Sequence, residues 1–144
     1  MTTRKIAAVI VGRSLVTASI DDSVEKAART MAVANVGAVL IVTNGRLEGI
    51  FTERDLLKRV VAVGKDPQTT LLKEVGTFDP VTISPERQLG HAMHLMMIGG
   101  FRHVPVVDNG EVVGVVSARD MLGAELIEFE HEVERLEEIA EILA

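Results

Sequence analysis

Two four-residue stretches place a hydroxyl, an arginine and a carboxylate at the same spacing. They are TERD at 52–55 and SARD at 117–120, and each follows a β-rich run that contains a glycine, Gly49 or Gly114. At the start of a helix, backbone N–H groups and the helix dipole favour a phosphate. A carboxylate there can also accept two hydrogen bonds from a vicinal diol, which a ribose offers. The two stretches therefore indicate paired sites for a phosphate and a ribose.

The same spacing also suits a purely structural role. A Thr or Ser at a helix start with an acidic residue three positions later is a capping-box pattern that stabilises by roughly 1 kcal/mol. Capping accounts for the hydroxyl and the carboxylate but needs neither the glycine nor the arginine. A glycine inside a strand often marks the close approach of another group. Both roles stay open from these residues alone.

The two stretches end a longer internal repeat. At a constant offset of 65 residues (117 minus 52), without a gap, Asn44-Gly45 meets Asn109-Gly110, Met31 meets Met96, and Val16-Thr17 meets Val81-Thr82. Two copies of one supersecondary unit therefore fill most of the chain.

Each copy predicts the element order β-α-β-β-α. A short extended segment leads into an amphipathic helix, near 24–31 and 89–96, and two β-rich runs then meet at an Asn-Gly tight turn. A last helix begins at each TERD or SARD stretch. Asp22 or Ser23 can cap the first amphipathic helix, and Ser84 followed by Pro85 is the expected start of the second. Residues 3–13 and 64–78 are predicted to be the linkers that precede each copy.

The copies are expected to share a core, because about 50 residues enclose too little apolar volume to be secure alone. We expect an α/β (α+β) fold of two pseudo-symmetric β-α-β-β-α repeats packed sheet to sheet, with two equivalent clefts at the seam. The predicted divisions are repeat 1 with its N-terminal linker at 3–63, repeat 2 with its linker at 64–127, and an acidic amphipathic helix at 128–144.

Composition narrows the functional classes. The 144 residues carry 21 acidic and 15 basic side chains for a net charge of −6, with 3% aromatic residues, which argues against nucleic acid as a partner. The lack of cysteine excludes disulfides and thiolate chemistry. An apolar run of only about six residues near the N-terminus is too short for a signal peptide or a membrane span. We expect no membrane association and a cytoplasmic location.

The duplicated junction resembles a known family. Glycine, two apolar residues, Thr or Ser, any residue, Arg and Asp at the last strand-to-helix junction of an ungapped duplication is similar to a pair of CBS domains, the regulatory tandem often called a Bateman module. The resemblance covers roughly 16–127, and the segments DPVTISPE and FRHVPVVDNGEVVGVVSARD are especially typical of the family. It implies binding of adenosine-containing ligands such as AMP, ADP, ATP, S-adenosylmethionine or NAD(H) in the seam clefts, with no catalytic activity and no cofactor.

The resemblance also implies site residues. Ribose would be held by Thr52 with Asp55 and by Ser117 with Asp120. The first strand of each copy would approach the base or phosphate through Thr17 or Thr82. The junction arginines and the start of the second strand complete the expected ligand-binding set: Arg54, Arg119, Ala38, Val39, His103, Val104 and Pro105.

The copies differ at positions that bear on binding. Copy two carries Arg102 and His103 where copy one has Gly37 and Ala38, so the cleft that receives the charged side chains is expected to hold phosphates better. Gly76 stands where relatives commonly carry Met, and the missing side chain is expected to loosen an adenine contact.

Metal binding and catalysis are weaker candidates. His91 and His94 lie three residues apart on one predicted helix, but two histidines do not specify a metal site, and we expect none. Asp55 and Asp120 have neither a nucleophile nor an electrophilic partner, so we do not expect an enzyme.

The C-terminal segment has a pattern of its own. From Leu122 to Leu143 apolar residues recur at alternating steps of four and three, and glutamates fill most positions between them. One interpretation is a helix folded back on its own module. The favoured one is a helix that dimerises or docks a partner, because an apolar seam needs a cover. Glutamates would crowd an in-register parallel pair, so an antiparallel or splayed contact is expected.

These patterns predict a non-catalytic sensor that binds AMP or another adenine nucleotide and passes its occupancy to a homodimer or to an effector protein. The alternative is a structural or interaction protein that acts through its C-terminal helix and whose clefts are vestigial.

Overall fold

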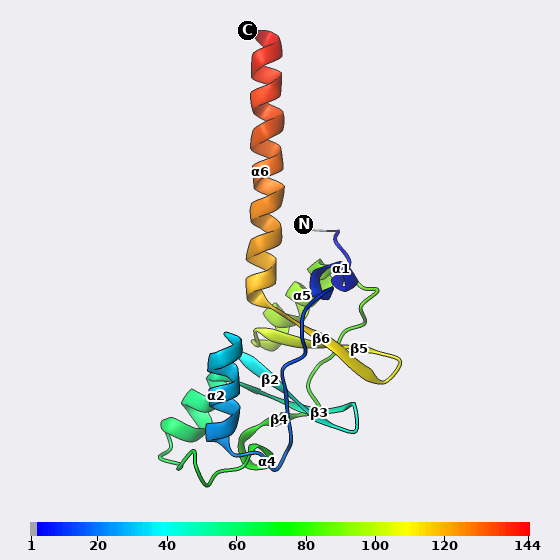
Figure 1. Cartoon of the computed structure of the whole chain (residues 1–144). Helices are drawn as coiled ribbons and strands as arrows, with labels where there is room; N and C mark the ends of the chain where they lie inside the picture. The colour runs from blue at the N-terminus through cyan, green and yellow to red at the C-terminus, as the bar shows by residue number, and fades with distance from the viewer. Residues whose placement is uncertain (1–2) are drawn as a thin grey trace.

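The computed structural model describes residues 3–144, apart from the side chains of residues 124 and 125. Repeat 1 contains β1 (Thr17–Ala18), α2 (Val24–Ala34), β2 (Ala38–Thr43), β3 (Arg46–Thr52), α3 (Glu53–Asp55) and the π-helix η1 (Leu56–Val61). Repeat 2 contains α5 (Leu89–Gly99), β5 (His103–Asp108), β6 (Glu111–Ser117) and α6 (Ala118–Leu143), and the linkers hold α1 (Ile6–Ile10), α4 (Leu72–Val75) and β4 (Thr77–Phe78). The expected α/β fold of two repeats with a long C-terminal helix is confirmed (Figure 1).

Each repeat is centred on a β-hairpin. Asn44 and Gly45 both have positive φ, as do Asn109 and Gly110, which is the conformation that Asn-Gly favours in a two-residue turn. β2 pairs antiparallel with β3, and β5 with β6. Both hairpins have a register shift, at 41/42 and at 106/107, so the duplication extends to the irregularities of the strands.

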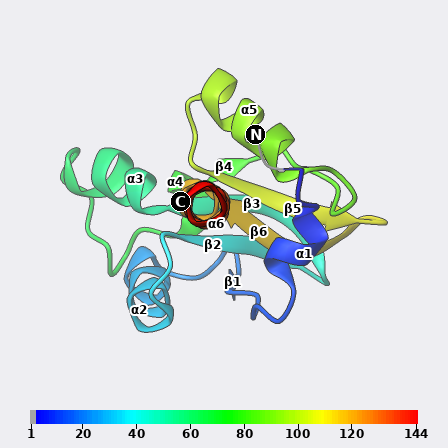
Figure 2. The same cartoon turned by 90° about the horizontal axis from the view of Figure 1, so that it is seen from above.

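The sheets of the two repeats pack face to face. The first has the order β1-β2-β3-β4, whereas the second contains β5 and β6, and a single parallel bridge between Ile83 and Val106 stands where repeat 1 has β1. Viewed from above, the strands lie between α5 and α2 (Figure 2). The expected sheet-to-sheet contact is confirmed by a buried cluster drawn from both sheets: Ala38, Leu40, Ile50 and Val112.

Each linker packs with the repeat that it does not precede. α1 comes before repeat 1, yet Ile6, Val9 and Ile10 belong to the buried core of repeat 2. α4 comes before repeat 2, yet Leu72 and Val75 belong to the core of repeat 1. The predicted domain boundaries at 63/64 and 127/128 remain predictions from the sequence. Each of the two hydrophobic cores contains residues from both sides of the 63/64 boundary.

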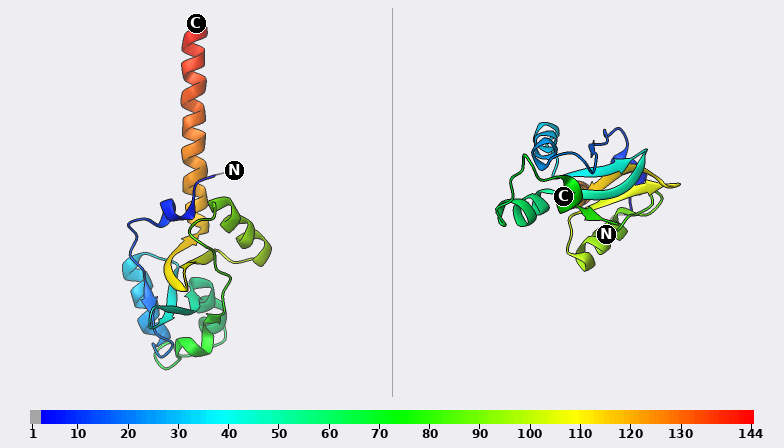
Figure 3. Two further views of the ribbon diagram at one scale, coloured as in Figure 1. Left: turned by 90° about the vertical axis from the view of Figure 1, so that its right-hand side faces the viewer. Right: turned by 90° about the horizontal axis from the view of Figure 1, so that it is seen from below.

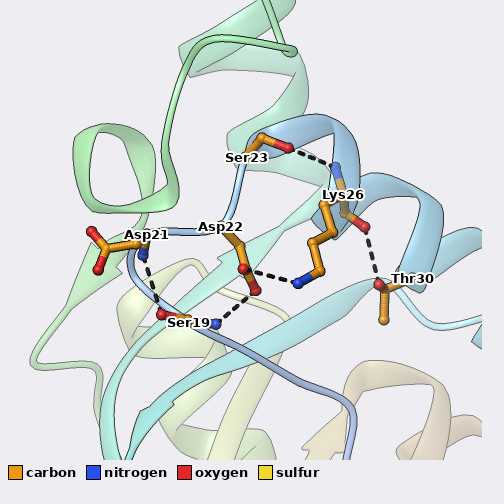
Figure 4. A network of polar contacts seen from close by, with 6 residues as sticks. All are labelled: Ser19, Asp21, Asp22, Ser23, Lys26 and Thr30. Carbon is orange, nitrogen blue, oxygen red and sulfur yellow. Dashed lines mark hydrogen bonds and ion pairs between the residues drawn. The ribbon is translucent and has the colours of Figure 1, made fainter.

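The start of α2 carries the cap that was expected there. Ser23 Oγ accepts a hydrogen bond from the Lys26 N–H at 3.1 Å (Figure 4). The Asp22 carboxylate accepts from the Ser19 N–H at 2.9 Å and from Lys26 Nζ at 3.1 Å. The backbone bond from Ser19, helped by Lys26, lowers the pKa of Asp22.

The prediction that Ser84 and Pro85 start the second amphipathic helix is wrong. α5 begins at Leu89, after Gln88, the residue equivalent to Ser23 at the repeat offset. Ser84 Oγ instead accepts from the Glu86 N–H at 3.2 Å in a local turn, as the equivalent serine of repeat 1 does from Asp21. Ser-Pro is favourable in a turn as well as at a helix start, and here the turn is formed.

α6 continues as one helix far beyond the body of the molecule (Figure 1, Figure 3). The equivalent segment of repeat 1 is short and π-helical, with the Ala62 N–H bonded to the Leu57 carbonyl at 2.9 Å. Across the described residues, no helix combines the length and the apolar character needed to cross a bilayer.

Candidate functional site

The junction of repeat 1 is a reciprocal cap around one carboxylate. Asp55 accepts from the Thr52 N–H at 3.0 Å and from the Thr52 hydroxyl at 3.2 Å, and the Asp55 N–H lies 3.3 Å from Thr52 Oγ1. These bonds use Oδ2, while Oδ1 lies 3.6 Å from Arg59 Nε. The capping role expected from the sequence is confirmed, and Asp55 is only 8% exposed.

The junction of repeat 2 uses a different arginine. The Ser117 N–H donates to Asp120 Oδ2 at 2.8 Å, and Arg13 Nη2 donates to Oδ1 at 2.6 Å. Arg13 lies between α1 and β1, on the linker that crosses to repeat 2. Its hydrogen bond to Asp120 raises the pKa of the Arg13 guanidinium. Each carboxylate therefore holds the helix start with one oxygen and presents the other toward an arginine.

The junction glycines have a structural explanation. A Cβ on Gly49 would lie 2.6 Å from the Thr77 carbonyl oxygen, so β4 can reach β3 only beside a glycine. A Cβ on Gly114 would lie 3.0 Å from Ile10 Cδ1 of α1. The segments that approach these glycines closely are therefore the two linkers that cross between the repeats.

Arg54 also has a partner within the chain. Its Nη1 donates at 2.6 Å to the carbonyl oxygen of Gly100, the C-cap residue that follows α5. This bond ties the junction of repeat 1 to repeat 2 and satisfies a carbonyl at a helix C-terminus. Arg119, the equivalent in repeat 2, makes no hydrogen bond or ion pair with any described residue.

Two cavities lie at the seam, and each is built from both repeats. The Thr52 cavity, of about 370 Å³, joins the repeat 1 junction to a wall from repeat 2; its members include Thr52, Arg54, Asp55, Pro80, Val81 and His103. The Ser117 cavity, of about 820 Å³, joins the repeat 2 junction to the equivalent wall from repeat 1; its members include Ser117, Arg119, Asp120, Leu15, Val16 and Ala38. Both volumes suit a small organic ligand.

The remaining residues of the expected set lie outside the cavity linings. Thr17 and Thr82 each follow a lining residue, Val16 or Val81, and line neither cavity. Val39 and Val104 are fully buried in the cores of repeats 1 and 2. Their side chains cannot reach a ligand in either cavity, because successive residues of a strand face opposite sides of the sheet. Pro105 is buried and also lines neither cavity.

Arg102 and His103 do not distinguish the cavities as expected, because both side chains line both of them. Glu53 is a further shared member. The difference lies in arginines that sequence reasoning missed, Arg59 in the Thr52 cavity and Arg13 in the Ser117 cavity. The spacing of four residues between Asp55 and Arg59 could have indicated the first, whereas nothing local indicated the second.

His103 occupies the boundary between the cavities. A Cβ on Gly37 would lie 3.2 Å from His103 Nε2 and 3.1 Å from Glu53 Oε1, so the absence of a side chain at 37 makes room for both groups. Burial lowers the pKa of His103, and the positive charge of Arg102 adds to this, while Glu53 opposes it. The imidazole is therefore held toward its neutral form.

Gly76 lines neither cavity, so the expected loosening of an adenine contact does not follow. A Cβ there would lie 2.9 Å from Ile41 Cδ1, inside the packing of repeat 1. The Gly76 carbonyl accepts from Arg59 Nη1 at 3.1 Å, which holds that arginine beside Asp55. No cluster of three metal-binding side chains occurs among the residues that the structure describes.

Comparison with known proteins agrees with this architecture. The family model of the CBS domain matches residues 6–62 and 72–126. The chain therefore belongs to the CBS-domain family, whose paired domains are regulatory modules, and it carries two such domains.

Among its relatives, the mitochondrial CBS domain-containing protein CBSX3 of Arabidopsis thaliana is 35% identical over 121 residues, which are 81% of this chain and 59% of the relative. The CBS domain-containing protein YhcV of Bacillus subtilis is 36% identical over 105 residues, which are 73% of this chain and 74% of YhcV. This chain thus spans little more than half of the plant protein.

Solved structures show the same fold. The CBS domain protein NE2398 has 30% sequence identity and a TM-score of 0.80, over 85% of this chain and 98% of that one. PAE2072 of Pyrobaculum aerophilum, solved in complex with AMP, has 27% identity and a TM-score of 0.78, over 88% of this chain and 96% of that one.

Proposed function

We propose that this chain binds an adenine nucleotide in its two seam cavities and passes the occupancy to a second copy or to an effector protein, without catalysing a reaction. The observation that carries the proposal is the reciprocal construction of the cavities, each of which joins the carboxylate junction of one repeat to a wall of the other. A ligand that touches both repeats favours one arrangement of them by its difference in affinity. The AMP complex of PAE2072 supports the choice of ligand.

The residues of each cavity match the parts of a nucleotide. The carboxylates of Asp55 and Asp120 suit ribose hydroxyls, and the apolar walls at 80–81 and 15–16 suit a purine face. Arg102 can bind a phosphate group in either cavity. Arg119 adds to the Ser117 cavity a second cation that has no partner among the residues that the structure describes. We therefore expect the Ser117 cavity to prefer ligands with more phosphate groups.

Homodimer formation is part of the proposal. The helices of both repeats present large apolar side chains to solvent, among them Val33 at 90%, Met97 at 77% and Ile98 at 71% exposed. Val33 and Ile98 are equivalent at the repeat offset. Such side chains gathered on helices favour association with another chain. A cytoplasmic location remains a prediction from the sequence.

Thermal unfolding with AMP, ADP, ATP, S-adenosylmethionine and NADH tests the ligand. A ligand at about 100 times its Kd adds roughly 2.7 kcal/mol, which such an assay resolves. The double variant Asp55→Asn with Asp120→Asn should lose the shift, whereas Asp108→Asn at the exposed end of β5 should keep it. The proposal fails if none of the five compounds stabilises the unsubstituted protein.

The second candidate is an interaction protein with vestigial cavities, which the exposed seam of α6 favours. Deletion of residues 129–144 separates the two functions. Loss of a larger assembly in sedimentation, together with no effect of any nucleotide on the full chain, would favour this second candidate.

A further inference from the structure

The far part of α6 carries an apolar surface that no described residue covers. We define the α6 seam by the steps of four and three residues that are typical of a coiled coil; its members are Leu122, Leu126, Phe129, Val133, Leu136, Ala140 and Leu143. Its large side chains range from 36% exposed at Val133 to 81% exposed at Leu143. The helix extends away from the body instead of folding back on it (Figure 1, Figure 3).

Most of the positions that flank the α6 seam between Phe129 and Leu143 are acidic. In the heptad numbering set by Phe129 and Leu136, Glu130 and Glu137 lie on one side, and Glu132 and the apolar Ile139 lie on the other. Residues 128–144 hold seven glutamates, and Arg135 is the only lysine or arginine among them. Arg135 falls on the outer part of the helix, two positions after Val133, where it cannot meet the flank of a partner helix.

A second copy is a poor cover for this surface. In a coiled coil the flanking residues of one helix face those of the other. Two α6 helices would therefore place Glu132 against Glu137 in the parallel orientation and Glu130 against Glu137 in the antiparallel orientation. The antiparallel contact that the sequence pattern favoured is thus also opposed by like charges. Such contacts repel at neutral pH, and no attractive pair offsets them.

We propose that the α6 seam docks a basic amphipathic helix of another protein, with apolar side chains at steps of four and three and with lysine or arginine at the flanking positions. Its apolar residues would bury the seam, and its cations would face Glu130, Glu132 and Glu137. Docking of this helix does not require a nucleotide in either cavity. Leu122 begins the seam and also lines the Ser117 cavity, so one helix carries both surfaces.

Synthetic peptides test the charge and the spacing separately. One fluorescent peptide has leucine at the seam positions and lysine at the flanks, a second has glutamate at the flanks, and a third keeps the lysines but replaces the leucines by serine. We expect the full chain to bind only the first in fluorescence anisotropy, with affinity falling at high salt. The double variant Phe129→Ser with Leu136→Ser should weaken that binding by about tenfold or more, since two anchors are lost.

Reversal of the flanks supplies the decisive control. Glu130→Lys with Glu132→Lys and Glu137→Lys should transfer binding from the lysine peptide to the glutamate peptide, while the melting temperature of the body stays unchanged because all three positions are exposed. Equal binding of the first and third peptides, or no binding of either, would overturn the proposal. So would self-association at pH 7 that the seam variant abolishes, because the seam would then belong to a second copy.

Discussion

Arg13 donates a hydrogen bond to Asp120 at 2.6 Å, joining the linker before repeat 1 to the junction of repeat 2. The equivalent carboxylate, Asp55, lies 3.6 Å from Arg59, one turn further along its own helix. Two junctions that are almost identical in sequence therefore present different acceptors to a ligand. At Asp120 the oxygen that faces away from the helix cap is already engaged by a residue of the crossing linker.

Arg13→Ala should change the preference between ligands. Its loss frees Asp120 Oδ1 for a ribose hydroxyl, so binding of adenosine should strengthen by about tenfold or less. AMP should gain less, because the cavity also loses a cation. Isothermal titration calorimetry of both compounds measures the ratio of their Kd values, and Arg46→Ala in the exposed hairpin turn is the control. An equal change for adenosine and AMP would show that Arg13 does not compete at Asp120.

The same substitution should cost little stability. The Arg13 side chain is 48% exposed, so solvent screens the ion pair. A loss of at most about 1 kcal/mol in the free energy of unfolding is expected.

Gly49→Ala and Gly114→Ala should differ in their cost to stability. The new Cβ at 49 would meet the backbone oxygen of Thr77 at 2.6 Å, and the backbone must move or β4 must leave the sheet. The new Cβ at 114 would meet Ile10 Cδ1 at 3.0 Å and Ile10 Cβ at 3.1 Å, so Ile10 and α1 have to shift only slightly. Urea unfolding should show a loss of about 1–3 kcal/mol at 49 and a smaller loss at 114. Equal costs would mean that the approach of β4 does not require the glycine.

Features encoded in local patterns could be predicted from the sequence. The two Asn-Gly turns, the Ser23 cap and the reciprocal cap of Thr52 with Asp55 each depend on residues within a few positions of one another, and all are present. The Ser84 prediction failed because a local Ser-Pro pair suits a turn as well as a helix. The repeat offset, which equates Ser23 with Gln88, places the start of α5 correctly.

The parts that could not be predicted depend on how the linkers cross. Nothing in residues 6–10 indicates that Ile6 and Ile10 fill the core of the more distant repeat. The same crossing brings Arg13 to Asp120 and explains why Gly114 and Gly49 are glycines. Contacts between residues so far apart in the sequence follow from the assembled fold. A local motif contains only one of the two residues in each such contact.

Thr52→Val should separate capping from packing, because valine keeps the shape of threonine but lacks the hydroxyl. The Asp55 N–H loses its acceptor and the carboxylate loses one donor, so the free energy of unfolding should fall by about 1 kcal/mol. Thr43→Val at the exposed end of β2 is the matched control and should change little in urea unfolding. A negligible effect at Thr52 would assign the hydroxyl to ligand binding alone.

Protonation of His103 should destabilise the fold, and the sign follows from its lowered pKa. Burial makes the charged form less favourable in the folded protein than in the unfolded chain, where the pKa is near 6.5. The unfolded state therefore binds more protons below that pH. Stability due to neutral His103 is fully present above pH 6.5 and is lost as the pH falls from there through the lower folded pKa.

His103→Gln should remove this part of the pH dependence. Glu53 and Asp120 favour the charged imidazole, while Arg102 and Arg54 oppose it. The pKa of His103 is therefore lowered mainly by burial. Urea unfolding between about pH 7.5 and 5.5, which brackets the ordinary histidine pKa, should show a smaller loss of stability in this variant than in the unsubstituted protein. His94→Gln on the exposed face of α5 controls for general effects of losing a histidine. An identical pH profile for the His103 variant would mean that the imidazole is solvated in the folded state and that the two cavities do not share a partly buried base.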